Sequence, residues 1–120
     1  MQSYKELVVY QRAYAQAIKM YRLAGKFPQE EQYGLTSQIK RAATSIPLNI
    51  AEGYGKLETG KELLRYLSMA RGSSAEMEVL LNFSKDLGYI TGEEYREAIE
   101  EQEAVGKMLT GLIKSVGSRS

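Results

Sequence analysis

The sequence predicts an all-α protein, an up-down-up-down bundle of four helices. Apolar residues recur at spacings of three and four along four segments, at about residues 4–25, 35–56, 60–87 and 92–116. No run alternates apolar and polar residues in the way that a half-buried β-strand does. The short connections between the segments favour antiparallel neighbours. With 120 residues and no internal repeat, the chain fits one domain, residues 1–120.

Three of the four segments open with the same start signal, the S/T-x-x-E capping box. In this motif a hydroxyl accepts a hydrogen bond from a backbone amide of the first turn, and a glutamate reaches back to the amide of the capping residue. Each match stands just before an apolar-periodic run, so all three predict helix starts. The pairs are Ser3 with Glu6, Thr59 with Glu62, and Thr91 with Glu94.

Two prolines punctuate this pattern. Pro28 is expected to break the chain after the first helix. Pro47 lies inside the second segment, whose periodicity continues beyond it, so we expect it to bend that helix and not to end it. The carbonyl of Ala43 would lose its usual partner, and Ser45, Asn49 or a water is expected to satisfy it.

The predicted core is a line of apolar or small residues on each helix. In the first segment this line is rich in tyrosine, for which core packing is the preferred interpretation and base stacking the alternative. The line of the first segment is Leu7, Tyr10, Tyr14, Ala17, Ile18 and Tyr21; that of the second is Ile39, Ala42, Ala43, Ile46, Ile50 and Gly53; that of the third is Leu63, Leu67, Ala70, Ser74, Met77, Leu81 and Ser84; that of the fourth is Tyr95, Ile99, Gln102, Val105, Leu109, Leu112 and Ile113.

The middle of the third segment, Gly72 to Ala75, consists of small residues. Small side chains let two helices approach closely, so we expect a helix–helix contact there. Gly88, just after this segment, suits the left-handed conformation in which helices commonly end.

A polar stripe runs along one side of the second segment, and acidic and hydroxyl residues follow in the third. We expect Arg41, Asn49 and Glu52 to pair with the third helix in a hydrogen-bonded network, because buried polar groups must be paired. The alternative is that the stripe faces a subunit interface or a ligand groove. The stripe is Gln38, Arg41, Ser45, Asn49, Glu52 and Lys56, and the partners are Ser73, Glu76 and Glu78.

Two absences limit the chemistry that the chain can perform. It has no cysteine, which excludes disulfides, thiolate metal sites and thiol nucleophiles. It also has no histidine, the commonest general base and transition-metal ligand. We therefore expect no enzymatic activity, no catalytic residues, no metal site and no cofactor.

The sequence also favours a cytoplasmic location away from membranes. The opening residues MQSYKEL lack the apolar stretch of a signal peptide. No apolar run approaches the roughly 20 residues that a membrane-spanning helix needs.

The small net charge of +1 conceals an asymmetry between the two parts of the chain. Residues 1–72 carry 11 Lys and Arg against 6 Glu, whereas residues 73–120 carry 5 Lys and Arg against 9 Asp and Glu. A basic surface would neutralise phosphates without reading bases, which makes RNA or DNA a candidate partner. The alternative is an ordinary solvated surface. The candidate nucleic-acid-binding residues are Lys40, Lys56, Lys61, Arg65 and Arg71.

Two stretches combine into a specific pattern, SIPLNIAEG at residues 45–53 and ARGSSAEME at residues 70–78. Phe27, Pro28, Glu31, Gly34 to Thr36, Gln38, Arg41 to Ala43 and Leu87 to Ile90 extend it over nearly the whole chain. The sequence resembles the bacterial four-helix-bundle proteins encoded in intervening sequences of 23S ribosomal RNA genes. This resemblance implies a homopentamer. It also implies a relation to the accessory proteins of diversity-generating retroelements, which bind nucleic acid and a reverse transcriptase.

Together these observations predict a homo-oligomeric nucleic-acid or ribonucleoprotein accessory protein, with a reverse transcriptase or another protein as a further candidate partner. The alternative is an oligomeric scaffold that binds only proteins, and a carboxylate-based enzyme or metal protein is the third and least favoured hypothesis. Independently of the resemblance, self-association is favoured by apolar residues that lie off the core lines. These residues are Leu48, Leu57, Leu64, Met69 and Val79.

Overall fold

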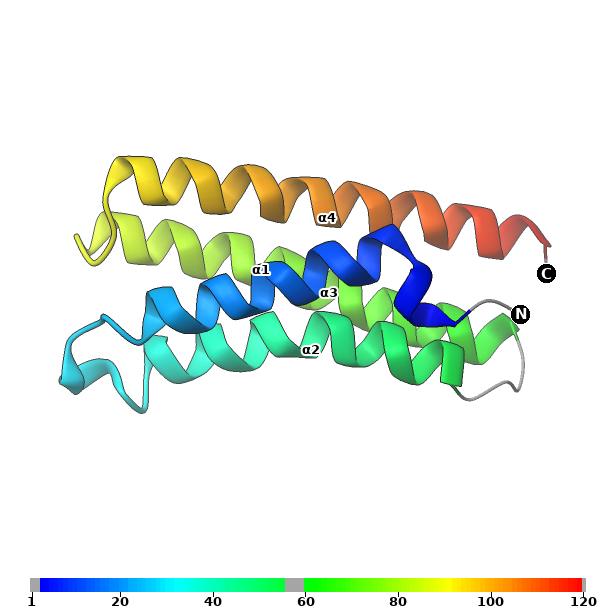
Figure 1. Cartoon of the computed structure of the whole chain (residues 1–120), viewed down its shortest axis with the longest axis horizontal. Helices are drawn as coiled ribbons and strands as arrows, with labels where there is room; N and C mark the ends of the chain where they lie inside the picture. Colours follow the sequence, from blue (N-terminus) through cyan, green and yellow to red (C-terminus); the bar gives the residue numbers. More distant parts are fainter. Residues whose placement is uncertain (1–2, 56–59, 120) are drawn as a thin grey trace.

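The computed structural model describes residues 3–55 and 60–119 and confirms the predicted four-helix bundle (Figure 1). The four long helices are α1 (Val8–Ala24), α2 (Leu35–Gly55), α3 (Gly60–Asp86) and α4 (Gly92–Arg119). Two short 3-10 turns, η1 (Tyr4–Glu6) and η2 (Gln29–Glu31), precede α1 and α2. The predicted ends of α2, α3 and α4 lie within three residues of the observed ones. No helix of the described residues has both the length and the apolar character needed to cross a membrane.

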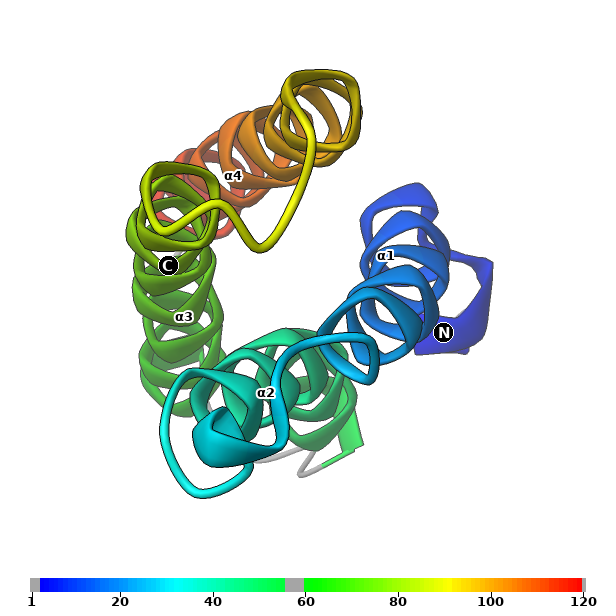
Figure 2. The same cartoon turned by 90° about the vertical axis from the view of Figure 1, so that its left-hand side faces the viewer.

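The helices follow one another around the bundle in chain order, as the view along the long axis shows (Figure 2). Each helix packs against the next, and α1 contacts α4 over a smaller region than it contacts α2. The predicted core lines of α2 and α3 are confirmed, since all their members are buried except the half-buried Leu63. The line of α4 is buried at Gln102, Val105 and Leu109, and half-buried towards both ends.

The buried face of α1 differs from the prediction. Tyr14, Ile18 and Tyr21, expected in the core, are 54%, 41% and 49% exposed. Both faces of this helix repeat every three or four residues, so periodicity alone does not distinguish them. The face that is buried is rich in alanine, whose small side chain lets α1 approach its neighbours, whereas the tyrosine hydroxyls remain in water. The buried residues are Val9, Ala13, Gln16, Ala17, Met20 and Ala24.

Helix α1 also begins later than predicted, at Val8. The hydroxyl of Ser3 accepts a hydrogen bond from the amide of Lys5, so it caps the turn η1 and not α1. The capping box predicted at Ser3 is therefore wrong. Leu7 is extended between the turn and the helix and packs against the core.

Of the other two predicted capping boxes, the one at the start of α4 is confirmed. The amide of Glu94 donates to the Thr91 hydroxyl at 3.0 Å, and the amide of Thr91 donates to the Glu94 carboxylate at 2.9 Å. The box at Thr59 lies outside the described residues. The prediction for Gly88 is confirmed, since its φ of 79° is left-handed.

Helix α2 continues through Pro47 to Gly55, as predicted. Ser45 and Asn49 do not bond to the carbonyl of Ala43, so these two side chains are not the partners that were expected. The Ser45 hydroxyl donates to the carbonyl of Ala42, and the Asn49 amide donates to the carbonyl of Ser45.

Close helix contacts occur at glycines other than the one predicted. Gly72 is exposed, and a Cβ added there would have open space around it. On α2, a Cβ at Gly53 would lie 2.9 Å from the Cβ of Tyr66 on α3. On α4, a Cβ at Gly106 would lie 3.3 Å from the hydroxyl of Ser74. Ser74 is buried as expected, so α3 makes its close approaches through Tyr66 and Ser74 and not through Gly72.

One end of the bundle is held together by Glu31. Its carboxylate accepts hydrogen bonds from the amide of Leu35, at 3.1 Å, and from the hydroxyl of Tyr89, at 2.8 Å. It therefore ties the start of α2 to the turn between α3 and α4. The Leu35 amide, and then the Tyr89 hydroxyl, hold the pKa of the Glu31 carboxyl below its ordinary value.

We expect Glu31→Gln to lower the melting temperature at pH 7, because an amide cannot offer two acceptor oxygens to Leu35 and Tyr89. The folded pKa of Glu31 lies below the unfolded one, so its contribution to stability is present above the unfolded pKa. That contribution is lost as the pH falls through the folded pKa. The difference between variant and parent should therefore shrink below about pH 4. Thermal unfolding followed by circular dichroism measures the difference in melting temperature, and Glu30→Gln serves as the exposed control. Equal melting temperatures of parent and Glu31→Gln at pH 7 would contradict a stabilising role for Glu31.

Gly53→Ala and Gly72→Ala form a matched pair of substitutions within helices. The first forces a methyl group against Tyr66 and is expected to lower the free energy of unfolding by about 1–3 kcal/mol. The second fills open space and is expected to raise it by about 0.5–1 kcal/mol, because alanine favours the helix over glycine. Urea unfolding measures the free energy of unfolding of both variants. Equal changes in the two would show that Tyr66 can shift to accommodate the added methyl group at little cost.

Candidate functional site

A buried polar layer links three helices at the middle of the bundle. Gln16 on α1, Ser74 on α3 and Gln102 on α4 are all at least 96% buried. The Gln16 amide donates to the carbonyl of Ala98 at 3.0 Å and to the Gln102 side chain at 3.3 Å. The Gln102 amide donates in turn to the Ser74 hydroxyl at 3.0 Å. Because every member is paired, the layer fixes the rotation of α1 and α4 about their own axes.

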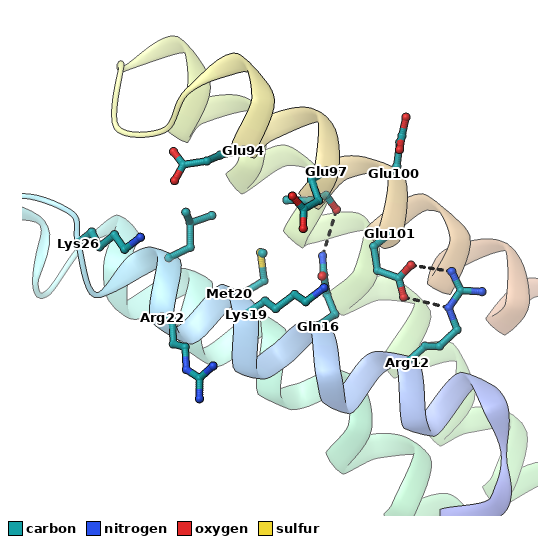
Figure 3. A pocket seen from close by; sticks show the side chains of 12 residues that line it. Arg12, Gln16, Lys19, Met20, Arg22, Lys26, Glu94, Glu97, Glu100 and Glu101 are labelled. Atoms are coloured by element: carbon teal, nitrogen blue, oxygen red, sulfur yellow. Dashed lines mark hydrogen bonds and ion pairs between the residues drawn. The ribbon is translucent and has the colours of Figure 1, made fainter.

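A groove of about 640 Å³ between α1 and α4 adjoins this layer at Gln16, and we call it the charged groove (Figure 3). The cationic residues lining it come from α1 and, for Lys26, from the turn just after α1, and the carboxylates come from α4. Lys19 and Glu97 point into the space between the helices, whereas Arg22 and Glu100 point away from it. The lining residues are Arg12, Gln16, Lys19, Met20, Arg22, Leu23, Lys26, Glu94, Glu97, Ala98, Glu100 and Glu101.

An ion pair closes one end of the charged groove. The guanidinium of Arg12 donates two hydrogen bonds to Glu101, at 2.6 and 2.9 Å. This pairing holds the pKa of the Glu101 carboxyl below its ordinary value. The lining carries as many cationic as anionic residues, so the groove as a whole does not attract a polyanion.

A second groove, of about 530 Å³, lies between α1 and α2, and we call it the tyrosine groove. None of its lining residues is charged, and Leu48 at its edge is 64% exposed. The ammonium of Lys40 lies beside it, 4.5 Å from the ring centre of Tyr21. Its lining is Tyr4, Tyr10, Tyr14, Ala17, Ile18, Tyr21, Thr44, Pro47, Leu48 and Ala51.

An apolar line also runs along the outer side of α3, and we call it the α3 ridge. Met69, Val79 and Phe83 are 44%, 52% and 54% exposed. With Gly72 and Glu76 they recur every three or four residues, which places them on one side of the helix. Leu87, in the turn after α3, continues the line and is 55% exposed.

The residues of the predicted polar stripe and their predicted partners do not form one network. Arg41 forms an ion pair with Glu76, and the hydroxyl of Ser45 bonds to that of Ser73. The Arg41 side chain is 61% exposed, so this network lies at the surface beside the α3 ridge. The other members do not join this network. Asn49 bonds within α2, and Glu78 faces Glu103 of α4. Gln38 and Glu52 are exposed and form no side-chain hydrogen bond with the described residues, and Lys56 lies outside the described residues.

The surroundings of Glu78 differ from those expected of a network member. It shares a groove between α3 and α4 with Arg71, Glu103 and Lys107. Burial, and then the charge of Glu103, raise the pKa of the Glu78 carboxyl.

The candidate nucleic-acid-binding residues do not form one continuous surface. Lys61 and Arg65 lie one turn apart at the start of α3, where Arg65 pairs with Glu62 at 3.2 Å. Lys40 is 15 residues from the end of α2, which places it about 22 Å from the end of the bundle where α3 begins. Arg71 faces the carboxylates of the α3–α4 groove. The fifth residue, Lys56, lies outside the described residues.

Two surfaces therefore escaped the sequence reasoning, the charged groove and the tyrosine groove. The tyrosine groove could have been predicted, because the first helix has two apolar faces and only one of them can be buried in the bundle. The charged groove could not have been predicted, because no sequence pattern indicates that α1 and α4 lie side by side. Within residues 3–55 and 60–119, no three His, Cys, Asp or Glu side chains come together as metal ligands would.

The architecture is that of a four-helix-bundle protein with grooves between its helices and exposed apolar residues on its surface. A family model for the 23S rRNA-intervening sequence proteins matches residues 5–111, and the chain belongs to this family. A crystal structure from Bacteroides thetaiotaomicron is similar to it, with a TM-score of 0.82 and 26% identity over 89% of this chain and 96% of that one. That structure is described as a protein of unknown function from the S23 ribosomal protein family. No curated protein matches the chain.

The polar layer can be tested with two serines that are equally buried. Ser74→Ala leaves the Gln102 amide without its acceptor, so we expect it to lower the free energy of unfolding by about 1–3 kcal/mol. Ser84→Ala removes only a bond to the carbonyl of Leu80 in the same helix and should cost less. Urea unfolding compares the two, and a Ser84 variant as unstable as the Ser74 variant would contradict a special role for the layer.

Proposed function

We propose that this protein is a homo-oligomeric accessory protein that binds RNA or DNA and has no catalytic activity. The observation that carries the proposal is the exposed apolar surface on two sides of the bundle, the tyrosine groove and the α3 ridge. Contiguous apolar patches on a small protein mark interaction sites. The family resemblance sets the expected number of subunits at five.

Nucleic-acid binding is supported by the start of α3. Lys61 and Arg65 are exposed and lie one turn apart, and Lys56 is close by in sequence. One chain offers too few cations for tight binding to a phosphate backbone. An oligomer repeats them, and several weak contacts on one strand then reinforce one another through effective concentration. Lys40 and Arg71 would act only at the margins.

A protein partner would bind elsewhere on the molecule. The charged groove offers a cationic wall on α1 and an anionic wall on α4, which suits a helix or loop with charges of both signs. By the family resemblance, a reverse transcriptase is one candidate for such a partner. The absence of histidine and cysteine supports a binding role over a catalytic one.

The second candidate function is an oligomeric scaffold that binds proteins and no nucleic acid. The carboxylates of α4 favour it, because Glu94, Glu97 and Glu101 line the charged groove and would repel phosphates. The pairing of Arg65 with Glu62 also favours it, since a carboxylate beside the arginine weakens a phosphate site.

Replacing Lys61 and Arg65 with glutamine distinguishes the two functions. If the protein binds nucleic acid at the start of α3, the double variant should bind single-stranded RNA several-fold more weakly at low salt, and binding by the parent should fall steeply with salt. The melting temperature should hardly change, because exposed ion pairs contribute little to stability.

Fluorescence anisotropy with labelled RNA and DNA measures the affinity, and light scattering measures the oligomer mass. The control is Arg96→Gln with Lys114→Gln on α4, which removes the same charge from another surface. A parent oligomer that binds neither single- nor double-stranded RNA or DNA at low salt would leave the protein-only scaffold as the function.

A further inference from the structure

Lys19 on α1 and Glu97 on α4 both point into the charged groove but do not pair with each other (Figure 3). Neither side chain forms a hydrogen bond or an ion pair with any residue that the structure describes. The two helices do pair where their side chains come close, since Arg12 and Glu101 bond at 2.6 and 2.9 Å at one end of the groove. Beyond that ion pair, a cationic and an anionic group face each other across an open space.

The floor of the charged groove offers an unused hydrogen-bond acceptor. Gln16 is 96% buried, and its amide nitrogen donates to the Ala98 carbonyl and to Gln102. Its side-chain oxygen accepts no hydrogen bond from the described residues. Within residues 3–55 and 60–119, no polar side-chain atom is both sealed from solvent and unpaired, so this oxygen keeps an opening, and the groove that Gln16 lines provides it. The oxygen can therefore accept a hydrogen bond from a donor that enters the groove.

We propose that the charged groove binds a free α-amino acid. The ligand carboxylate would lie at Lys19, and the ligand ammonium at Glu97 and the Gln16 oxygen. Met20 and the half-buried Leu23 also line the groove, so an aliphatic ligand side chain would find apolar atoms beside the charged ones. This site goes beyond the proposed function, which assigns the groove only to a segment of a protein partner.

The balance of charge in the groove selects a ligand that carries both signs. Four cationic and four anionic residues line it, on opposite sides. An anion attracted by one side is repelled by the other, and a cation experiences the reverse, so a ligand of one sign gains little. The two charged groups of an amino acid gain from both sides at once, and each can form charge-assisted hydrogen bonds. A phosphate, a metal ion or a polyamine lacks this advantage.

Leucine and two analogues with the same branched chain test the need for both charges. Isocaproate lacks the ammonium group of leucine, and isoamylamine lacks its carboxylate. We expect NMR titration of the isotope-labelled protein to show saturable shifts with leucine, including those of the Gln16 side-chain amide. Each analogue should bind about tenfold more weakly, because it loses the hydrogen bonds of one charged group. Equal binding of all three compounds, or no binding of leucine, would overturn the proposal.

Four substitutions by glutamine separate the groups that point into the groove from groups that point away. Lys19→Gln and Glu97→Gln should each weaken leucine binding about tenfold. Arg22→Gln and Glu100→Gln remove the same charges from the same two helices, but these side chains point away from the groove (Figure 3). They should change leucine binding by less than about twofold, because exposed charges at a distance are screened by salt.

All four of these residues are exposed, so the variants should keep the melting temperature of the parent. Equal weakening of leucine binding in all four would overturn the assignment of the ligand to the groove.

A blocked dipeptide, N-acetyl-glutamyl-lysine amide, distinguishes a free amino acid from a segment of a protein partner. It carries both charges on side chains and has no charged backbone end. If this dipeptide shifts the groove signals and leucine does not, the amino-acid site is overturned, and the protein partner of the proposed function remains. If leucine binds while the parent protein binds no RNA or DNA, the amino-acid site stands and the nucleic-acid function fails.

Discussion

The rotation of α1 about its own axis is the constraint on which the surfaces of this protein depend. Gln16 sets it, because its side chain reaches the Ala98 carbonyl and Gln102 across the interior only when the alanine face of α1 is buried. Turning the tyrosines inward would withdraw Gln16 from this layer and leave the buried side-chain oxygen of Gln102 without its donor, at a cost of about 1–3 kcal/mol. The exposure of Tyr14 and Tyr21 therefore follows from a hydrogen bond on the opposite side of the helix.

The same constraint makes the two sides of α1 unlike each other. Towards α2 the helix presents aromatic and aliphatic side chains around Pro47, and towards α4 it presents Arg12 and Lys19 to a row of carboxylates. An apolar surface left in water favours association with another apolar surface. A surface with balanced charges keeps its solvation and adds little to association, while selecting a partner by charge. The bundle thus separates an uncharged, apolar side of α1 from a side with charges of both signs.

Periodicity, caps and turn residues were enough to predict four helices, the core lines of α2 and α3, and the left-handed Gly88. They were not enough to orient α1, because its two faces share the spacing of three and four and differ only in side-chain size. The capping box at Ser3 failed because Leu7 leaves the helical conformation to reach the core. The basic residues did not gather into one surface because helix length separates Lys40 from Lys61, which a count of charges does not reveal.

A closed ring of subunits, which the family resemblance implies, would also decide where nucleic acid can bind. Rotation about a ring axis keeps every copy at the same height, so each start of α3, with Lys61 and Arg65, would lie at the same level. A strand following the ring would then meet these cations in every subunit, and effective concentration would add the contacts together. A two-fold dimer whose axis crosses the bundles would point the same residues in opposite directions and separate them. In the proposed function, the way in which the copies meet would therefore matter more for holding a polyanion than the charge of one chain.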